Sequence, residues 1–192
     1  GKTYEDRPLM LAFISSVDNM DKLEQIRKDN LTRAGIIKGS TKTKKVGIVW
    51  LSYNIHGNEA NSTEAAMKTL HALADKSNIN TQEWLKNTIV IIDPSVNPDG
   101  RDRYANWYRM TANRWPDADP LGREHMEPWP GGRTNHYYFD LNRDWAWQTQ
   151  IESQLRIVKY NEWLPHIHVD FHEQGYNSPY YFAPAAKPLH QY

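Results

Sequence analysis

Two segments of the sequence carry histidine and carboxylate side chains at spacings that suit a metal ion. The first is His56-Gly57-Asn58-Glu59, which follows an apolar segment at 46–52 and precedes a helical pattern that begins near residue 62. A histidine and a glutamate three residues apart on a tight turn can converge on one cation. We expect Gly57 and Asn58 to adopt the unusual backbone angles of such a turn. The motif alone is also typical of a surface turn, so it needs a partner from elsewhere in the chain.

The second segment, residues 166–173, alternates polar and apolar side chains. If it is an extended strand, one face carries His166, His168, Asp170 and His172. His172 comes last, at the end of the strand, where it can meet His56 and Glu59. Two histidines and one glutamate form the ligand set of a catalytic zinc site, with a fourth position left for water. A metal bound by His168, Asp170 and His172 is an alternative, although ligands spaced along one strand diverge more than ligands from two loops.

The elements that must position these residues follow from the hydrophobic pattern. Four apolar segments predict strands, at 9–15, 46–52, Thr88–Asp93 and Ile167–Phe171. Their nearly continuous hydrophobicity favours strands buried on both faces of a largely parallel sheet. Helical patterns lie between them at 20–33, 62–74 and 149–163, and the last two begin with sequences typical of capping boxes. We therefore predict one α/β domain over residues 1–192, with a mixed, mainly parallel sheet and helices on both faces.

One long segment, from about residue 97 to residue 147, interrupts this alternation. It is polar, rich in aromatic residues and in turn sequences such as Asn97-Pro98-Asp99-Gly100. We expect it to lack regular structure and to lie at the rim of the sheet, where α/β folds bind their ligands. A flexible insertion is the alternative, but disordered segments are usually poor in aromatic residues.

Composition excludes several classes of function. Lys+Arg 23 and Asp+Glu 23 give a net charge of zero, so no basic surplus indicates nucleic acid as a partner. No apolar stretch approaches the roughly 18 residues of a membrane span. The basic cluster at 42–45 precedes an apolar segment and is interpreted as a solvated entry to a strand. The chain has no cysteine, so a metal site must use histidine and carboxylate ligands.

The chain resembles the metallocarboxypeptidases of the zinc carboxypeptidase (M14) family, and the resemblance runs almost from end to end. Five features carry it in the order expected for the family: the opening segment at 1–8, His56-Gly57-Asn58-Glu59, Asn97-Pro98-Asp99-Gly100 after a strand, Asp140-Leu141-Asn142-Arg143-Asp144-Trp145, and His172. The resemblance implies that one Zn²⁺ is bound by His56, Glu59 and His172.

The same resemblance implies roles for residues around the metal. Asn142 and Arg143 would bind the terminal carboxylate of a peptide, for which a planar guanidinium offers two parallel donors. Asp140 would accept a hydrogen bond from His56 and fix its tautomer. For the arginine that polarises the scissile carbonyl, the sequence around Arg109 is most similar to that of the family. Arg114 and Arg133 are its rivals.

The implied activity is hydrolysis of a C-terminal peptide bond, in which zinc-activated water attacks the scissile carbonyl. The general base of the family is a glutamate far beyond the third zinc ligand, so we expect this chain to be an N-terminal part of the catalytic domain, inactive alone. Glu173 adjoins His172 but should face the wrong way to replace that base. Two alternatives are a zinc amidohydrolase or deacylase acting on small acylated amino acids, and a zinc-binding module without catalytic activity. By analogy with the family we expect a secreted or periplasmic protein.

Overall fold

The computed structural model describes residues 1–175, which form a four-stranded sheet with the order β1-β3-β2-β4. The strands are β1 (Ala12–Ile14), β2 (Gly47–Tyr53), β3 (Thr88–Asp93) and β4 (Ile167–Phe171). β2 pairs in parallel with both β3 and β4, and only β1 is antiparallel to its neighbour β3. The predicted mixed, mainly parallel sheet is thus confirmed.

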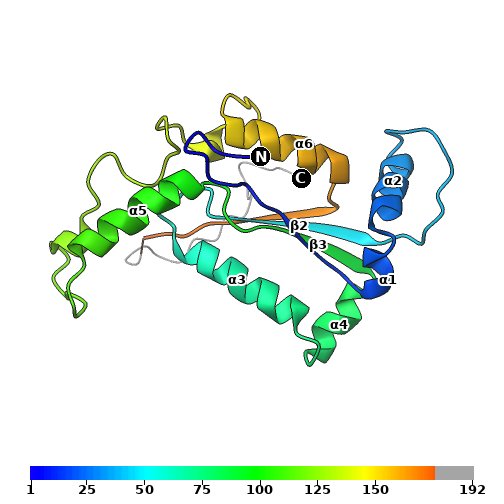
Figure 1. The fold of residues 1–192 in the computed structure, drawn as a ribbon, viewed down its shortest axis with the longest axis horizontal. Helices are drawn as coiled ribbons and strands as arrows, with labels where there is room; N and C mark the ends of the chain where they lie inside the picture. The colour runs from blue at the N-terminus through cyan, green and yellow to red at the C-terminus, as the bar shows by residue number, and fades with distance from the viewer. Residues whose placement is uncertain (176–192) are drawn as a thin grey trace, which may run out of the picture.

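Helices cover both faces of the sheet (Figure 1). α3 (Asn61–Ala74) and α4 (Ile79–Leu85) lie on one face, and α2 (Leu23–Arg33) and α6 (Ile151–Trp163) lie on the other. Alternate residues of β3 supply the two cores, because successive side chains of a strand point to opposite faces. Ile89 and Ile91 pack toward α2 and α6, whereas Val90 and Ile92 pack toward α3 and α4.

Several predicted boundaries and caps differ from the structure. β1 has three residues instead of seven, and the helix predicted at 20–33 begins at Leu23 as α2, after a separate short helix α1 (Val17–Met20). Neither predicted capping box forms, because α3 and α6 begin without a side-chain cap. At α3 the amide of Ser62 donates instead to the carboxylate of Glu173, and at α6 the buried Glu152 accepts from Asn135. At the starts of both helices, hydrogen bonds to residues distant in the sequence have thus replaced the local capping bonds.

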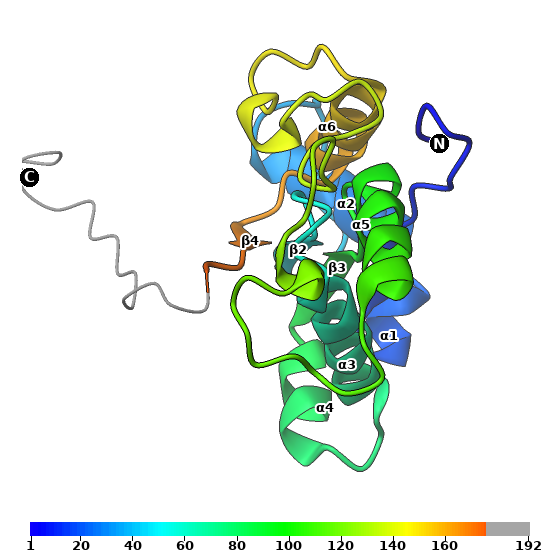
Figure 2. The ribbon, with the colours of Figure 1, turned by 90° about the vertical axis from the view of Figure 1, so that its left-hand side faces the viewer.

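The long segment expected to lack regular structure contains helix α5 (Pro98–Thr111) and two short 3-10 helices, η1 (Arg123–His125) and η2 (Leu141–Arg143). The expectation was wrong for α5 because its start signals were interpreted as a turn. Asn97 accepts from the amide of Gly100 at 2.9 Å, and Pro98 occupies the first turn, where its missing N–H costs nothing. Figure 2 shows α5 and the loop after it at the end of the sheet to which β2 and β3 point.

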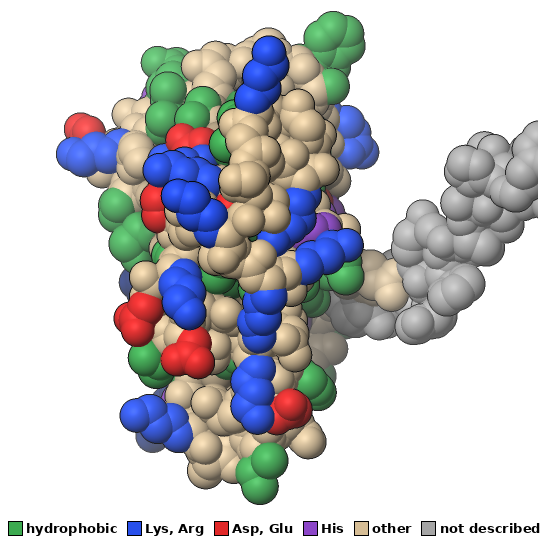
Figure 3. Space-filling model, turned by 90° about the vertical axis from the view of Figure 1, so that its right-hand side faces the viewer, with side chains coloured by type: hydrophobic (Ala, Val, Ile, Leu, Met, Phe, Trp, Pro, Cys, Tyr) green, Lys and Arg blue, Asp and Glu red, His purple; other side chains and the backbone are tan. Residues whose placement is uncertain are grey.

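The opposite end of the molecule is basic. Lys and Arg side chains gather on the face around α2 and the residues that lead into β2 (Figure 3). Lys42, Lys44 and Lys45 are exposed there, in keeping with a solvated entry to the strand. Among residues 1–175, no helix has the length and apolar character needed to cross a membrane.

Candidate metal centre

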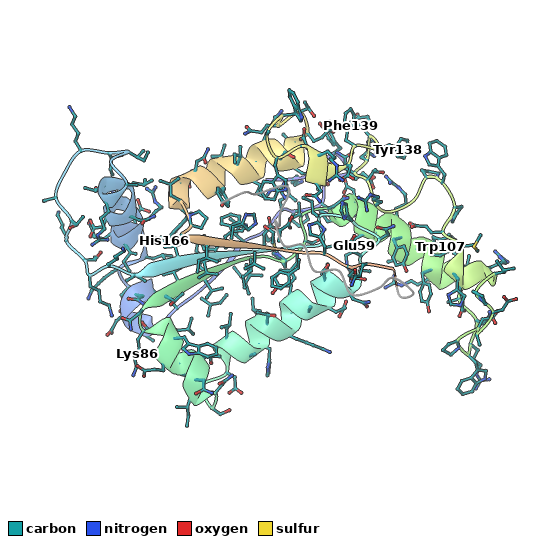
Figure 4. The ribbon with its side chains drawn as sticks, turned by 180° about the vertical axis from the view of Figure 1, so that it is seen from behind. Glu59, Lys86, Trp107, Tyr138, Phe139 and His166 are labelled. Atoms are coloured by element: carbon teal, nitrogen blue, oxygen red, sulfur yellow. The ribbon has the colours of Figure 1, made fainter. Side chains whose placement is uncertain are left out.

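The three predicted metal ligands converge at the carboxyl ends of two neighbouring strands. His56 and Glu59 lie in the loop after β2, and His172 follows the last residue of β4 directly. One donor atom from each side chain can be chosen such that all three lie within 4.8 Å of one another. Figure 4 shows Glu59 at this edge of the sheet, beside the start of α3. β2 and β4 are paired in parallel, so the two distant segments meet because their strands are adjacent.

Carboxylates flank both histidine rings in the same sense. Nδ1 of His56 lies 2.8 Å from Glu59 Oε1, and Nδ1 of His172 lies 3.6 Å from Glu59 Oε2. On the far side of each ring, Nε2 faces an aspartate: His56 Nε2 is 3.2 Å from Asp140 Oδ1, and His172 Nε2 is 2.9 Å from Asp170 Oδ2. If a cation occupied the space beside Glu59, the carboxylate at Nε2 would hold the ring proton there and Nδ1 would offer its lone pair. Both rings therefore present Nδ1 to the space beside Glu59.

This donor set fits a zinc ion. Four ligands about 2.1 Å from a tetrahedral zinc lie about 3.4 Å apart, so donors already within 4.8 Å need only small movements to bind it. Two imidazoles and one carboxylate are also the ligand chemistry of catalytic zinc, and they leave a fourth position open.

The alternative site along β4 does not assemble. Nε2 of His168 lies 3.0 Å from the hydroxyl of Ser52, and Asp170 is engaged with His172. Within residues 1–175, the group of side chains close enough to bind a metal is His56, Glu59 and His172.

Electrostatics keep the acidic groups of the site ionised. Burial alone would raise the pKa of Glu59, but the hydrogen bond from His56 and the backbone amide of Glu173 lower it below its ordinary value. Burial likewise opposes ionisation of Asp140, and the charge of His56 with the backbone amide of Asn142 outweighs it, so the pKa of Asp140 is also lowered. Both carboxylates are therefore poised to accept hydrogen bonds or to bind a cation.

A buried asparagine that the sequence interpretation missed holds the metal loop. Asn54 directly follows β2 with a φ of 60°, and its side-chain amide donates to the carbonyls of His56, Gly57 and Glu59 at 3.0, 3.3 and 3.0 Å. The left-handed residue of this loop is thus Asn54, and the expectation that Gly57 and Asn58 supply the unusual angles was wrong. An asparagine next to a strand end, two residues before the motif, was the available signal.

Gly57 is required by close packing instead. A Cβ placed on Gly57 would lie 2.2 Å from the carbonyl carbon of Gly100 and 2.4 Å from the carbonyl oxygen of Gly132. A Cβ on Gly100 would in turn lie 2.3 Å from that same oxygen of Gly132. Three glycines from distant motifs therefore bring three backbones into contact. The side-chain amide of Asn97 joins them further, by donating to the carbonyls of Ile55 and Arg133 at 3.3 and 3.2 Å.

The three candidate arginines lie in different places. Arg133 Nη2 is 3.1 Å from Asp140 Oδ2, and its Nη1 is 4.0 Å from Glu59 Oε1. Arg109 is exposed in the last turn of α5. Because Gly100 abuts the metal loop and a helix rises 1.5 Å per residue, Arg109 lies roughly 14 Å further along the helix axis. Arg114 lies 5.7 Å from the ring of Trp115. Only Arg133 contacts metal-site carboxylates among the ion pairs of residues 1–175.

Asn142 and Arg143 are tied to the metal loop through Asp140. Asp140 Oδ1 accepts from the amide of Asn142 at 2.9 Å as well as facing His56, so it begins η2 and contacts a predicted ligand at once. Arg143 is exposed, and its side chain makes no ion pair or hydrogen bond within the described part of the chain. Its guanidinium is therefore available to an anion.

Glu173 does not point its carboxylate at the histidines. Its backbone amide donates to Glu59 Oε2 at 2.9 Å, while its side chain accepts from the amide of Ser62 at 3.1 Å. The residue links the third ligand to the metal loop and to the start of α3.

A mainly parallel sheet with a His–Glu–His donor set at its carboxyl edge defines an α/β protein with a candidate zinc centre. The sequence profile of the zinc carboxypeptidase family matches residues 1–162, and the chain belongs to that family. No curated protein matches the chain.

Solved structures show the same fold. A metallo-carboxypeptidase from Burkholderia cenocepacia is 15% identical with a TM-score of 0.58, over 91% of this chain and 35% of its own. A metallo-carboxypeptidase from Pseudomonas aeruginosa, in complex with (2-guanidinoethylmercapto)succinic acid, is 14% identical with a TM-score of 0.54, over 91% and 34%. Carboxypeptidase A from Helicoverpa armigera is 16% identical with a TM-score of 0.51, over 91% and 40%. The chain thus spans between a third and two fifths of the length of these structures.

Proposed function

We propose that the full-length protein containing this chain is a zinc-dependent carboxypeptidase that removes the C-terminal residue of a peptide. The observation that carries the proposal is the set of contacts made by the carboxylate of Asp140. One carboxylate contacts the predicted ligand His56, the cation Arg133 and the backbone of Asn142. The metal loop and the loop that would bind a carboxylate are therefore fixed relative to each other.

A zinc ion bound by His56, Glu59 and His172 would polarise a carbonyl and lower the pKa of a water molecule. The residues around it have separate tasks in this proposal. Asp140 holds the ring of His56 so that Nδ1 faces the metal position. The exposed guanidinium of Arg143, beside the amide of Asn142, binds the free carboxylate of the substrate as a charge-assisted pair. This contact selects the last peptide bond of a chain.

Arg133 is the arginine that best suits the developing oxyanion. It lies within 4.0 Å of Glu59, whereas Arg109 is at the far end of α5. A preorganised donor next to the reacting carbonyl stabilises the transition state, and removal of such a donor costs on the order of 100-fold or more in kcat. We assign the general base to sequence outside residues 1–175, because Glu173 is bonded to the start of α3.

The test compares a peptide with its C-terminal amide, using the full-length protein with and without a zinc chelator. We expect hydrolysis of the free acid only, and its loss in the chelator. Arg143→Met should raise KM for the acid, and Arg133→Met should lower kcat. Arg109→Met is the matched control, since it removes an exposed arginine from the same segment. A loss of kcat in Arg109→Met but not in Arg133→Met would instead identify Arg109 as the carbonyl-polarising group.

Two outcomes would replace the proposal. Equal hydrolysis of acid and amide would favour the amidohydrolase or deacylase alternative. Zinc binding without any turnover would favour the binding module. The first measurement is zinc content, with His56→Ala and His172→Ala beside the wild type; about one zinc per chain, lost in both variants, would support a shared site.

A further inference from the structure

Asp170, the aspartate that contacts His172, has a hydrogen-bond partner for only one of its two carboxylate oxygens within residues 1–175. Asp170 Oδ2 is paired with His172 Nε2 at 2.9 Å, while Asp170 Oδ1 is buried and has no hydrogen-bond partner within residues 1–175. A buried carboxylate oxygen without a donor costs free energy, so a donor is expected nearby.

Among the described residues, Arg156 of α6 is a buried donor without an acceptor, whereas Asp170 has a buried acceptor without a donor. Its residue is 7% exposed, and both Nη1 and Nη2 are buried without a hydrogen-bond partner in the described part of the chain. The guanidinium packs 4.1 Å from the ring of Trp145. An arginine stays protonated in proteins, so this buried cation needs anionic neighbours.

The packing of α6 places Arg156 over the row that contains Asp170. Tyr160 lies over β2 and β4, with its ring 5.3 Å from both Trp50 and His168. α6 runs opposite to β4 (Figure 1), so Arg156, one turn earlier on the helix, lies about two residues later along the strands.

Two residues later, the sheet carries an acidic row. Ser52 of β2 is in register with Asp93 of β3 on one side and with Asp170 of β4 on the other. Neighbouring strands are about 4.8 Å apart, so the two aspartates flank Ser52 on the face covered by α6. The charges of Asp93 and Asp170 are the two strongest that act to raise the pKa of Arg156 against its burial.

The other half of the site has these three kinds of group in contact. His56 Nε2 faces Asp140 Oδ1, and Asp140 Oδ2 is paired with Arg133 Nη2 at 3.1 Å. Histidine, aspartate and arginine thus follow one another on this side of Glu59. On the second side, Asp170 and Arg156 make no direct ion pair within residues 1–175, and each has buried polar atoms without a hydrogen-bond partner.

We propose that Asp170 and Arg156 are positioning residues for His172: Arg156 engages Oδ1 of Asp170, which leaves Oδ2 to accept the Nε2 proton of His172. The ring then keeps Nδ1 unprotonated and directed at the position beside Glu59. This inference rests on the proposed metal site, and it adds that the core helix α6 sets the geometry of the most exposed ligand.

The experiment has two readouts on the full-length protein. The first is the tautomer of His172 in the metal-free protein, from ¹⁵N chemical shifts of its ring. We expect the Nε2-protonated form in the wild type and a mixture of tautomers in Asp170→Asn. The second is zinc affinity by competition with a chelator. Asp170→Asn should lower the zinc affinity ten- to a hundredfold, as the loss of a carboxylate hydrogen-bonded to a histidine ligand does at other metal sites.

Arg156 is tested by its dependence on Asp170. Arg156→Met should weaken zinc binding in the wild-type background but add nothing to Asp170→Asn, because both act through one contact. Arg156→Lys keeps a cation and a donor and should preserve the tautomer; it also serves if Arg156→Met does not fold. Glu152→Gln is the matched control, a buried carboxylate one turn from Arg156 that bonds to Asn135 and not to a metal ligand.

The failures are distinguishable. A wild-type tautomer and wild-type zinc affinity in Asp170→Asn would overturn the inference, as would full additivity of the two substitutions or an equal loss in Glu152→Gln. Absence of zinc binding by the wild type would overturn the proposed function instead, and the tautomer measurement would still decide the role of Asp170.

Discussion

The two halves of the candidate metal centre are built differently. His56 is 3% exposed and sits in a loop held by buried amides and by three glycine backbones in contact. The side chain of His172 is 33% exposed and follows a strand whose outer residues, Ile167 and Val169, are exposed in the described chain. One ligand is fixed by the surrounding fold, and the other depends on Asp170 and on the backbone contact of Glu173.

The difference teaches how a site can be assembled from distant segments. The His56 half is complete in itself, because Asn54, Asn97 and Asp140 satisfy the polar groups of its loop. The His172 half acquires its position from the pairing of β4 with β2 and from α6 above it. Substitutions in the first half should therefore affect folding, and those in the second should affect mainly metal binding.

The largest expected effect is on folding, from Gly57→Ala. A methyl group there would lie 2.2 Å from backbone atoms that cannot rotate away, so the three contacting segments must separate. We expect a loss of about 3 kcal/mol or more in the free energy of unfolding. Gly47→Ala is the control, since its Cβ would meet nothing closer than 3.6 Å. Urea denaturation measures both, and equal stabilities would show that the loop yields easily.

A smaller effect should separate the two histidines in the absence of metal. His56→Ala leaves Glu59 and Asp140 without the buried ring between them, so we expect a loss of about 1–3 kcal/mol. His172→Ala removes a more exposed ring and should change stability by about 0.5 kcal/mol or less. Denaturation in the presence of a chelator tests this, and equal losses would contradict the contrast between the halves.

The sequence allowed much of this to be predicted, for reasons that differ by residue. β3 and β4 were predicted with the bounds they have, because the apolar residues of each segment stop where polar residues begin. β3 is buried as expected, whereas the expectation of burial on both faces was wrong for β4, an edge strand on which Ile167 and Val169 are exposed. His56, Glu59 and His172 could be grouped because parallel strands bring their carboxyl ends to one edge. These are consequences of local pattern and of a general rule of topology.

Other features could not be derived from local pattern. The role of Gly57 depends on Gly100 and Gly132, which approach it only in the folded chain. Asn54 was missed because its three acceptors are carbonyls, and backbone groups leave no mark in a sequence. The proximity of Arg133 to Glu59 likewise depends on how the loop after α5 returns to the sheet.

The last prediction examines the acidic row beneath α6, where the His172 half meets the core. Burial raises the pKa of Asp93 to about 7, with Arg156 acting against the shift and Asp170 adding to it. An unfolded aspartate releases its proton near pH 3.9, so between about pH 4 and pH 7 the folded state binds a proton that the unfolded state does not. The free energy of unfolding must then fall as pH rises through this range.

Asp93→Asn should abolish that contribution. We expect the stability of the wild type, relative to the variant, to decline by up to about 1.4 kcal/mol per pH unit between pH 5 and pH 7 and to level off above it. Urea denaturation of both proteins at several pH values, with a chelator present, measures the difference, and titration of the histidines common to both cancels. Parallel plots of stability against pH for the two proteins would mean that Arg156 holds Asp93 ionised throughout. The guanidinium of Arg156 would then pair more strongly with Asp93 than with Asp170.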